Sequence, residues 1–169
     1  MAIRRKKTGA ISAARVVIIA VVAASILKMF VIDLVIVRGE SMSPTIGTGT
    51  VALVARCAFG IRSPLSGRYA LRWAEPLPGD IVLVDPAPAG SRRAIKRVFE
   101  TGPAFMRAES GILAARGGSV PLGPFSSSKL AGTTYVPAGR AFLTGDNGGS
   151  SFDSRDYGSV PIETIAGKV

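Results

Sequence analysis

Residues 16–38 read VVIIAVVAASILKMFVIDLVIVR and join a long apolar run to a β-branched run with no turn between them. Counted back through the preceding alanines, the apolar part predicts a helix over residues 10–32. A helix that crosses a membrane needs about 20 residues, so this one is long enough. Lys28, near its end, has a side chain that can reach the membrane interface. The continuation through residues 31–38 predicts the first strand of a folded domain.

A cleaved secretory signal peptide also has a basic start and an apolar core. This apolar stretch is long for such a peptide and continues into the strand, so we favour an uncleaved anchor. The cluster Arg4-Arg5-Lys6-Lys7 places the N-terminus in the cytoplasm by the positive-inside rule. We therefore expect a single-pass protein of the inner (plasma) membrane. Residues 1–9 would be cytoplasmic, residues 10–32 the transmembrane anchor and residues 33–169 a domain on the outer face.

The composition excludes several kinds of active site. The chain has no histidine, which removes Ser-His-Asp, Cys-His and histidine-ligated metal mechanisms. Cys57 is the only cysteine, so no disulfide forms within the chain. The net charge is +10, and residues 1–38 hold seven Lys/Arg and one Asp, a net of +6. Because most of the excess lies beside the apolar run, we expect membrane contact and no nucleic-acid partner.

Beyond the anchor the pattern is that of short strands bounded by turns. The chain has 20 glycines and 11 prolines, and no long 3.6-residue period follows residue 40. Residues 59–78 predict a loop or long hairpin whose aromatic and arginine side chains suit either a membrane interface or ordinary packing. We expect a mainly β domain of coiled antiparallel sheets with strands near residues 31–38, 50–56, 80–85, 94–99, 104–108, 133–136 and 140–144.

Ser41 lies in the segment VRGESMSPTI, residues 37–46, after a predicted strand and a glycine. A short helical turn is expected over Met42–Ile46, with Pro44 in its first turn. A serine at such a bend is exposed near backbone N–H groups, which suits a nucleophile beside an oxyanion site. Taken alone, the same segment is also typical of an ordinary turn or helix cap.

Lys96 lies in RRAIKRVF, residues 92–99, which alternates as a strand does. Ala94, Lys96 and Val98 would share one face, opposite Ile95, Arg97 and Phe99. A lysine among small apolar side chains loses its proton more readily, because burial disfavours the ammonium. The neutral amine is a general base, and such a base predicts an alkaline activity optimum. A basic surface strand is the alternative interpretation.

The third segment, TGDNGGSSFDSRDYGSVP, covers residues 144–161 and is rich in glycines and hydroxyls. Asp153 and Arg155 are two residues apart and can pair. A calcium site formed by polar side chains of this segment is a competing hypothesis, but Arg155 is a poor neighbour for it and the spacing fits no known calcium loop. Its ligands would be Asp146, Asn147, Asp153 and Asp156.

Behind a membrane anchor, these segments together resemble the type I signal peptidases. The serine motif SMxPT of that family is similar to residues 41–45, and its Lys-Arg-Val motif to residues 96–98. A further motif resembles Pro78-Gly79-Asp80-Ile81-Val82. The C-terminal motif GDN…S.DSR..G.VP resembles residues 145–161. Four motifs in this order cover nearly the whole chain after the anchor.

The resemblance implies roles for individual residues. Ser41 would be the nucleophile, and its backbone N–H would be one oxyanion donor. Lys96 would be the general base, and Ser151 would hydrogen-bond and orient it. Asp153 and Arg155 would form a buried structural pair. No metal or cofactor is implied, and the substrates would be preproteins that carry signal peptides with small residues at positions −1 and −3.

Two motif positions next to the nucleophile complete the candidate site. Met42 follows Ser41 within the serine motif. Gly39 stands where some members of the family have a serine whose hydroxyl completes the oxyanion hole. A pilin or conjugative-transfer maturation peptidase of the same Ser/Lys group remains the enzymatic alternative. A self-cleaving repressor would need a DNA-binding region where this chain has a membrane helix. We expect a monomer.

Overall fold

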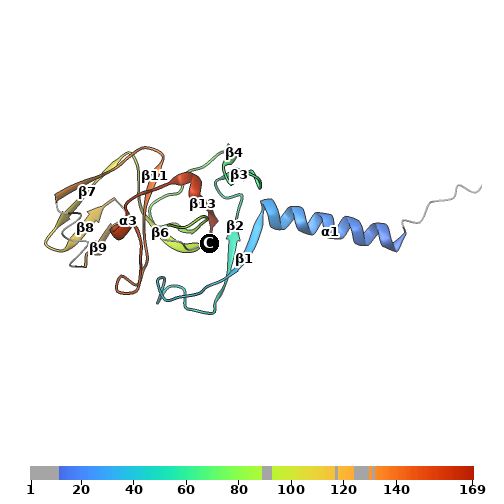
Figure 1. Ribbon diagram of the computed structural model, residues 1–169, viewed down its shortest axis with the longest axis horizontal. Coiled ribbons are helices and arrows are strands. Elements are labelled where there is room, and N and C mark those ends of the chain that lie inside the picture. The colour runs from blue at the N-terminus through green and yellow to red at the C-terminus, as the bar shows by residue number, and fades with distance from the viewer. Residues whose placement is uncertain (1–11, 89–92, 117, 124–129, 131) are drawn as a thin grey trace, which may run out of the picture.

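The computed structural model describes residues 12–88, 93–116, 118–123, 130 and 132–169. Its first element is the helix α1 (Ala13–Phe30), which extends away from a β-rich body (Figure 1). Among the described residues, α1 is the one helix long and apolar enough to cross a membrane, and none of its residues is buried. The predicted fold class, mainly antiparallel β behind one apolar N-terminal helix, is confirmed. The predicted basic N-terminus, residues 1–9, lies outside the described residues.

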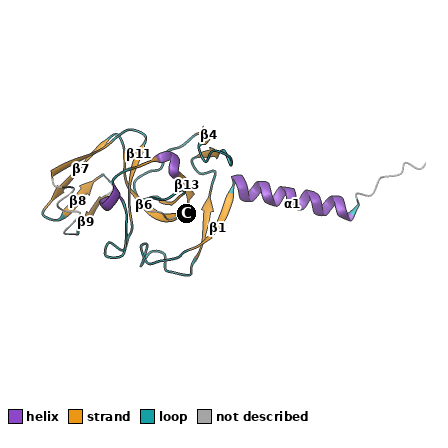
Figure 2. Ribbon diagram, in the orientation of Figure 1, coloured by secondary structure: helices purple, strands orange, loops and turns teal. Residues whose placement is uncertain are grey.

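The β-rich body contains three antiparallel sheets within the described residues (Figure 2). The largest has seven strands in the order β1 (Ile32–Ile36), β2 (Val51–Ala55), β13 (Ile165–Lys168), β5 (Ile81–Val84), β6 (Ala94–Thr101), β11 (Arg140–Thr144) and β12 (Val160–Pro161). The second has four, in the order β10 (Gly132–Val136), β7 (Ala104–Glu109), β8 (Ile112–Ala115) and β9 (Gly118–Pro121). The third pairs β3 (Gly60–Arg62) with β4 (Tyr69–Arg72). A short helix, α3 (Ser154–Tyr157), and a 3₁₀ turn at Ile162–Thr164 follow β11.

The two larger sheets share one apolar cluster. Phe142 of β11 packs edge-to-face on Phe99 of β6, with ring centroids 6.2 Å apart. Met106, Leu113 and Val136, from the four-stranded sheet, complete the same buried cluster. Because fully buried aromatic side chains carry a large share of packing energy, this cluster holds the second sheet against the first.

The pairing order leaves two strand edges open beside each other. Four antiparallel pairings in succession, from β1 through β2, β13 and β5 to β6, make β1 and β6 run in the same direction. Among the described residues, β1 lies at the end of its sheet, with one edge unpaired. Within the same residues, β11 joins β6 only from Arg97 onward, which leaves the β11-side edge of Ala94–Lys96 unpaired. These two edges form opposite walls of a cleft.

The strands expected from the sequence are present, but the sequence missed β8, β9 and β13. β13 reads IAGK and lacks an alternating β-branched pattern, yet it is central and largely buried. Gly167 fits there because a Cβ would press on the Ala55 carbonyl of β2, so tertiary packing and not propensity makes this strand. Residues 59–78 form the β3–β4 hairpin, one of the two alternatives expected.

Truncating the buried aromatic that joins the sheets should destabilise the protein. Phe142→Ala is expected to lower the free energy of unfolding by about 3–5 kcal/mol, because Phe142 is 1% exposed. Phe105→Ala is the matched control: Phe105 is 72% exposed and its ring contacts that of Tyr135, so it should cost less than about 1.5 kcal/mol. Denaturant melts of the detergent-solubilised chain measure both. Equal losses in the two variants would contradict the assigned core.

Candidate active site

Ser41 lies on a turn that the end of β1 and the neighbouring backbone hold in place. Gly39, just before it, has φ +89°, a conformation that favours glycine, and its carbonyl accepts a hydrogen bond from Thr48 Oγ1 at 2.8 Å. The Ile46 N–H donates to the Met42 carbonyl at 2.9 Å, which closes the expected helical turn. Met42 is 1% exposed and packs in the core, so it fixes the turn while Ser41 stays half-buried.

Lys96 is buried on β6 and contacts a hydroxyl instead of a carboxylate. Its Nζ donates to Ser151 Oγ at 2.7 Å, and the residue is only 5% exposed. Burial lowers the pKa of Lys96, and the nearby Arg155 lowers it further, whereas Asp153 opposes the shift. The result is an amine that loses its proton at lower pH than an exposed lysine does.

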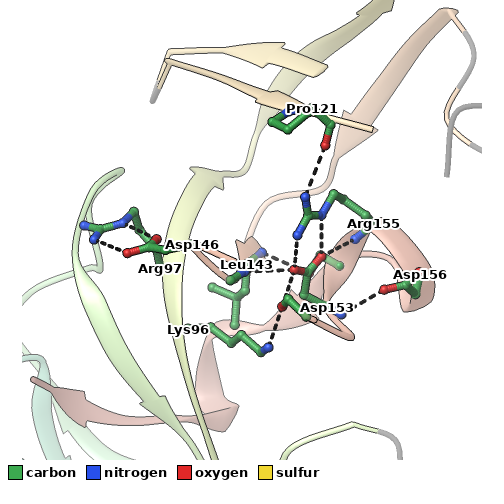
Figure 3. Close-up of polar contacts among 11 residues, drawn as sticks. Lys96, Arg97, Pro121, Leu143, Asp146, Asp153, Arg155 and Asp156 are labelled. Atoms are coloured by element: carbon green, nitrogen blue, oxygen red, sulfur yellow. Dashed lines mark hydrogen bonds and ion pairs between the residues drawn. The ribbon is translucent and has the colours of Figure 1, made fainter. Parts of the chain in front are cut away.

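Ser151 is itself held by the Asp153 carboxylate. Ser151 Oγ donates to Asp153 Oδ2 at 2.6 Å, so its lone pairs are left to accept from Lys96. Asp153 is fully buried and forms a two-point ion pair with Arg155, at 2.9 Å to Nε and 2.6 Å to Nη2 (Figure 3). Burial opposes ionisation of Asp153, but the bonds from Arg155, the Gly145 N–H and Ser151 lower its pKa, and the carboxylate stays charged.

Gly145 places the Ser41 turn against the lysine–serine pair. A Cβ added at Gly145 would overlap both the Ser151 side chain and the Ser41 carbonyl oxygen. That same carbonyl accepts a hydrogen bond from the Asn147 N–H at 3.0 Å. The loop after β11 therefore contacts Ser41 on one side and Ser151 on the other, and it brings the two predicted halves of the site together.

One ion pair of the site, between Arg97 and Asp146, was not predicted from the sequence. Arg97 donates to both oxygens of Asp146, at 2.8 and 2.7 Å (Figure 3). It also donates to the Gly79 carbonyl at 2.8 Å. The Arg97 hydrogen bond, together with one from Thr45, lowers the pKa of Asp146. Asp146 thus joins β6, through Arg97, to the serine turn, through Thr45. Both residues of the ion pair lie inside the quoted motifs, and their opposite charges were the one sequence feature that could have predicted the ion pair.

The geometry leaves no place for the alternative calcium site. Asp146 is engaged by Arg97, and Asp153 by Arg155. Within the described ranges, no three His, Cys, Asp or Glu side chains are grouped closely enough to hold a metal ion. The competing hypothesis is therefore not supported.

A cleft of about 660 Å³ leads to Ser41. One wall is formed by residues 34–38, which are the end of β1 and the two residues after it, and the other by Leu83, Asp85 and the start of β6. Met42 lies at its base. Of the predicted site residues, Ser41 and Met42 line this cleft, and the close packing at Gly145 holds Ser151, the partner of Lys96, near Ser41. No hydrogen bond joins Ser41 Oγ to Lys96 Nζ among those that the structure records for the described residues.

Comparison with known proteins identifies relatives along nearly the whole chain. The family model for signal peptidase, peptidase S26, matches residues 10–169. Signal peptidase I of Bacillus caldolyticus is 30% identical over 158 residues, 89% of this chain and 84% of that protein. Mitochondrial inner membrane protease subunit 1 of Schizosaccharomyces pombe is 32% identical over 132 residues, 78% of this chain and 66% of that protein. The chain thus spans most of the first relative and just under two thirds of the second.

Among solved structures, a signal peptidase I from Enterococcus faecalis V583 aligns with a TM-score of 0.43 and 22% identity. The alignment covers 57% of this chain and 97% of that one.

The buried lysine should make stability depend on pH in a definite direction. A lysine whose folded pKa is lowered opposes folding fully below that pKa, and the penalty vanishes above its unfolded value, about 10.4. Lys96→Met should therefore raise the melting temperature at pH 7, and its advantage should shrink as the pH approaches 10.4. Lys168→Met, at an exposed lysine paired with Asp80, is the control and should show no such gain. A pH-independent difference for Lys96→Met would contradict the burial effect.

Proposed function

Because the chain belongs to the signal peptidase family, peptidase S26, we propose that it is a membrane-bound serine endopeptidase that removes N-terminal signal peptides from exported preproteins. The observation that carries the proposal is the hydrogen-bonded series Lys96–Ser151–Asp153, which packs through Gly145 against Ser41, a lining residue of the cleft. In a chain without histidine, a buried lysine with a lowered pKa is the group suited to activate a serine.

In the proposed mechanism, Lys96 takes the proton from Ser41 Oγ as that oxygen attacks the scissile carbonyl carbon. The backbone N–H of Ser41 stabilises the developing oxyanion. Lys96 then gives the proton to the leaving amine as the peptide bond breaks. The signal peptide is now joined to Ser41 through an ester. Lys96 deprotonates a water molecule, which attacks this ester carbonyl, and the proton returns to Ser41 Oγ as the signal peptide leaves.

The other site residues have positioning roles in this mechanism. Ser151 accepts a hydrogen bond from one Lys96 N–H, which leaves the lone pair of the neutral amine free to take the proton of Ser41. Asp153 and Arg155 hold Ser151 in its acceptor orientation. Gly39 gives the chain its turn before the nucleophile, and buried Met42 anchors it.

The open edges of β1 and β6 would bind the substrate as an added strand. A segment lying between them, parallel to both, gains main-chain hydrogen bonds from Val35–Val37 on one side and Ala94–Lys96 on the other. Apolar side chains of these strands and Met42 line the cleft and leave shallow pockets suited to small residues at positions −1 and −3. Selectivity then comes mainly from excluding larger side chains.

We place the active site on the outer face of the inner (plasma) membrane, with α1 as the transmembrane anchor and residues 1–9 in the cytoplasm. The apolar surface of α1 and the basic residues before it support this topology. The β3–β4 hairpin provides a second lipid contact, since Leu65, Leu71 and Trp73 are exposed. Along the long axis of the molecule, the hairpin lies at the end nearer α1 (Figure 1). The enzyme would act as a monomer, without cofactor or nucleic acid.

The maturation-peptidase alternative is not favoured, because the relatives described above are signal peptidases and an inner membrane protease.

Removing either member of the proposed dyad should abolish cleavage. Ser41→Ala and Lys96→Ala should each lower kcat/KM by at least about 10³-fold, because nucleophile and base act as one unit. The assay is cleavage of a preprotein with an Ala-x-Ala site by detergent-solubilised enzyme, with circular dichroism to verify folding. Wild type that cuts nothing would favour the narrower maturation peptidase. A fully active Lys96→Ala enzyme would refute the mechanism.

A single methyl group at Gly145 should disable the enzyme without removing any functional group. Gly145→Ala forces Ser41 and Ser151 apart, and displacements of about 1 Å cost on the order of 10²-fold in rate. Gly149→Ala, in the same loop, meets nothing closer than 3.9 Å and should retain nearly full activity. The same preprotein assay compares the two variants. Similar activities would show that the contact at Gly145 does not position the site.

A further inference from the structure

The active-site cleft adjoins a second depression, and one arginine lies between them. The second depression, about 530 Å³, is lined by Ser25, Lys28 and Met29 of α1 and by Asp33, Leu34, Arg56 and Arg93. Leu34 and Arg93 line both depressions. A route along the surface therefore runs from the last turns of α1, past Arg93, to Ser41.

Two carboxylates on opposite sides of the cleft hold Arg93 in this position. Its Nη1 lies 3.2 Å from Asp33 Oδ2 on β1, and its Nε donates to Asp85 Oδ2, just after β5, at 2.9 Å. Asp33 is 6% exposed and also accepts from Arg56 at 3.2 Å. Arg93 itself is 43% exposed, so its guanidinium joins the two walls and still faces the route.

If the chain is a signal peptidase, as proposed above, its substrate follows this route. The part of a signal peptide ahead of the cut is apolar and lies in the bilayer, where α1 also lies. It therefore reaches the cleft from the α1 side and runs parallel to β1 and β6. Arg93 precedes Lys96 by three residues, about 10 Å along an extended chain, and thus lies beside the substrate residue about three to five positions ahead of the cut.

The charge at this point is predominantly positive. Lys28, Arg56 and Arg93 line the second depression with Asp33, and Asp85 of the cleft also pairs with Arg93. Three cations thus face two carboxylates, of which Asp33 is buried beneath the two arginines. A basic substrate side chain passing here meets like charges, whereas an acidic one gains a partner. We propose that Arg93 is a specificity-determining residue that selects substrates by the charge of the residues three to five positions ahead of the cut, favouring acidic over basic side chains.

The test measures kcat/KM for one preprotein with an Ala-x-Ala site. Positions −4 and −5, which lie within the proposed range and outside the −1 and −3 pockets, are changed one at a time to Ala, Glu or Lys. For wild type, the Glu substrate should be cut roughly three- to tenfold better than the Lys substrate at the position nearest Arg93. Arg93→Gln should bring this ratio close to one, and Arg93→Glu should invert it. If Arg93 had only a structural role, its substitution would lower kcat/KM equally for the Ala, Glu and Lys substrates. The Glu-to-Lys ratio would then stay unchanged.

Arg107→Glu is the matched control, since Arg107 lies on β7, is 74% exposed and pairs with Glu109. It makes the same charge change away from the cleft and should keep the wild-type ratio. If Arg93→Glu fails to fold, the ratio for Arg93→Gln decides. A wild-type Glu-to-Lys ratio near one at every position, or an unchanged ratio in the Arg93 variants, overturns this inference. Cleavage of the Ala substrate in the same experiment still upholds the proposed function. Failure of wild type to cut the Ala substrate overturns both.

Discussion

The site depends on one buried carboxylate. Asp153 is fully buried, and an isolated charge there would cost several kcal/mol or become protonated. It remains ionised because five donors converge on it: three groups of Arg155, the Gly145 N–H and the Ser151 hydroxyl. The same residue caps α3, so the carboxylate orders the helix and the loop before it.

This arrangement constrains the lysine without pairing it directly with an acid. The Ser151 proton points to Asp153, so Ser151 can only accept from Lys96. A neutral lysine amine that donates there retains a lone pair for a second partner. Direct contact with a carboxylate would have raised the pKa of Lys96 and kept it charged. Ser151, between Lys96 and Asp153, keeps the lysine amine oriented without direct contact with the acid. Arg155 offsets the charge of Asp153, so burial has the largest effect on the pKa of Lys96.

Local motifs predicted which residues lie together in the candidate site, because the serine turn, the lysine strand and the last loop are each continuous in sequence. Contacts between motifs were harder to foresee. Arg93 reaches Asp33 and Asp85, which are 60 and 8 residues away, and neither acid belongs to the serine or lysine motif. The alternation in residues 92–99 predicted that the two faces of β6 would differ, and this prediction was incomplete. Both faces are covered, and Ile95, Lys96, Val98 and Phe99 are all buried. Short-range alternation does not report such two-sided burial.

The connection between anchor and domain sets where the proposed reaction occurs. α1 ends at Phe30 and β1 begins at Ile32, so the chain passes from helix to strand within one residue. In the proposed topology, a substrate bound parallel to β1 would leave the bilayer near the same level and extend at the same rise, about 3.3 Å per residue. Enzyme and substrate would then need similar numbers of extended residues to reach Ser41. A site fixed in this way would select substrates by the length of the polar segment before the cut as well as by the small side chains at the cut itself.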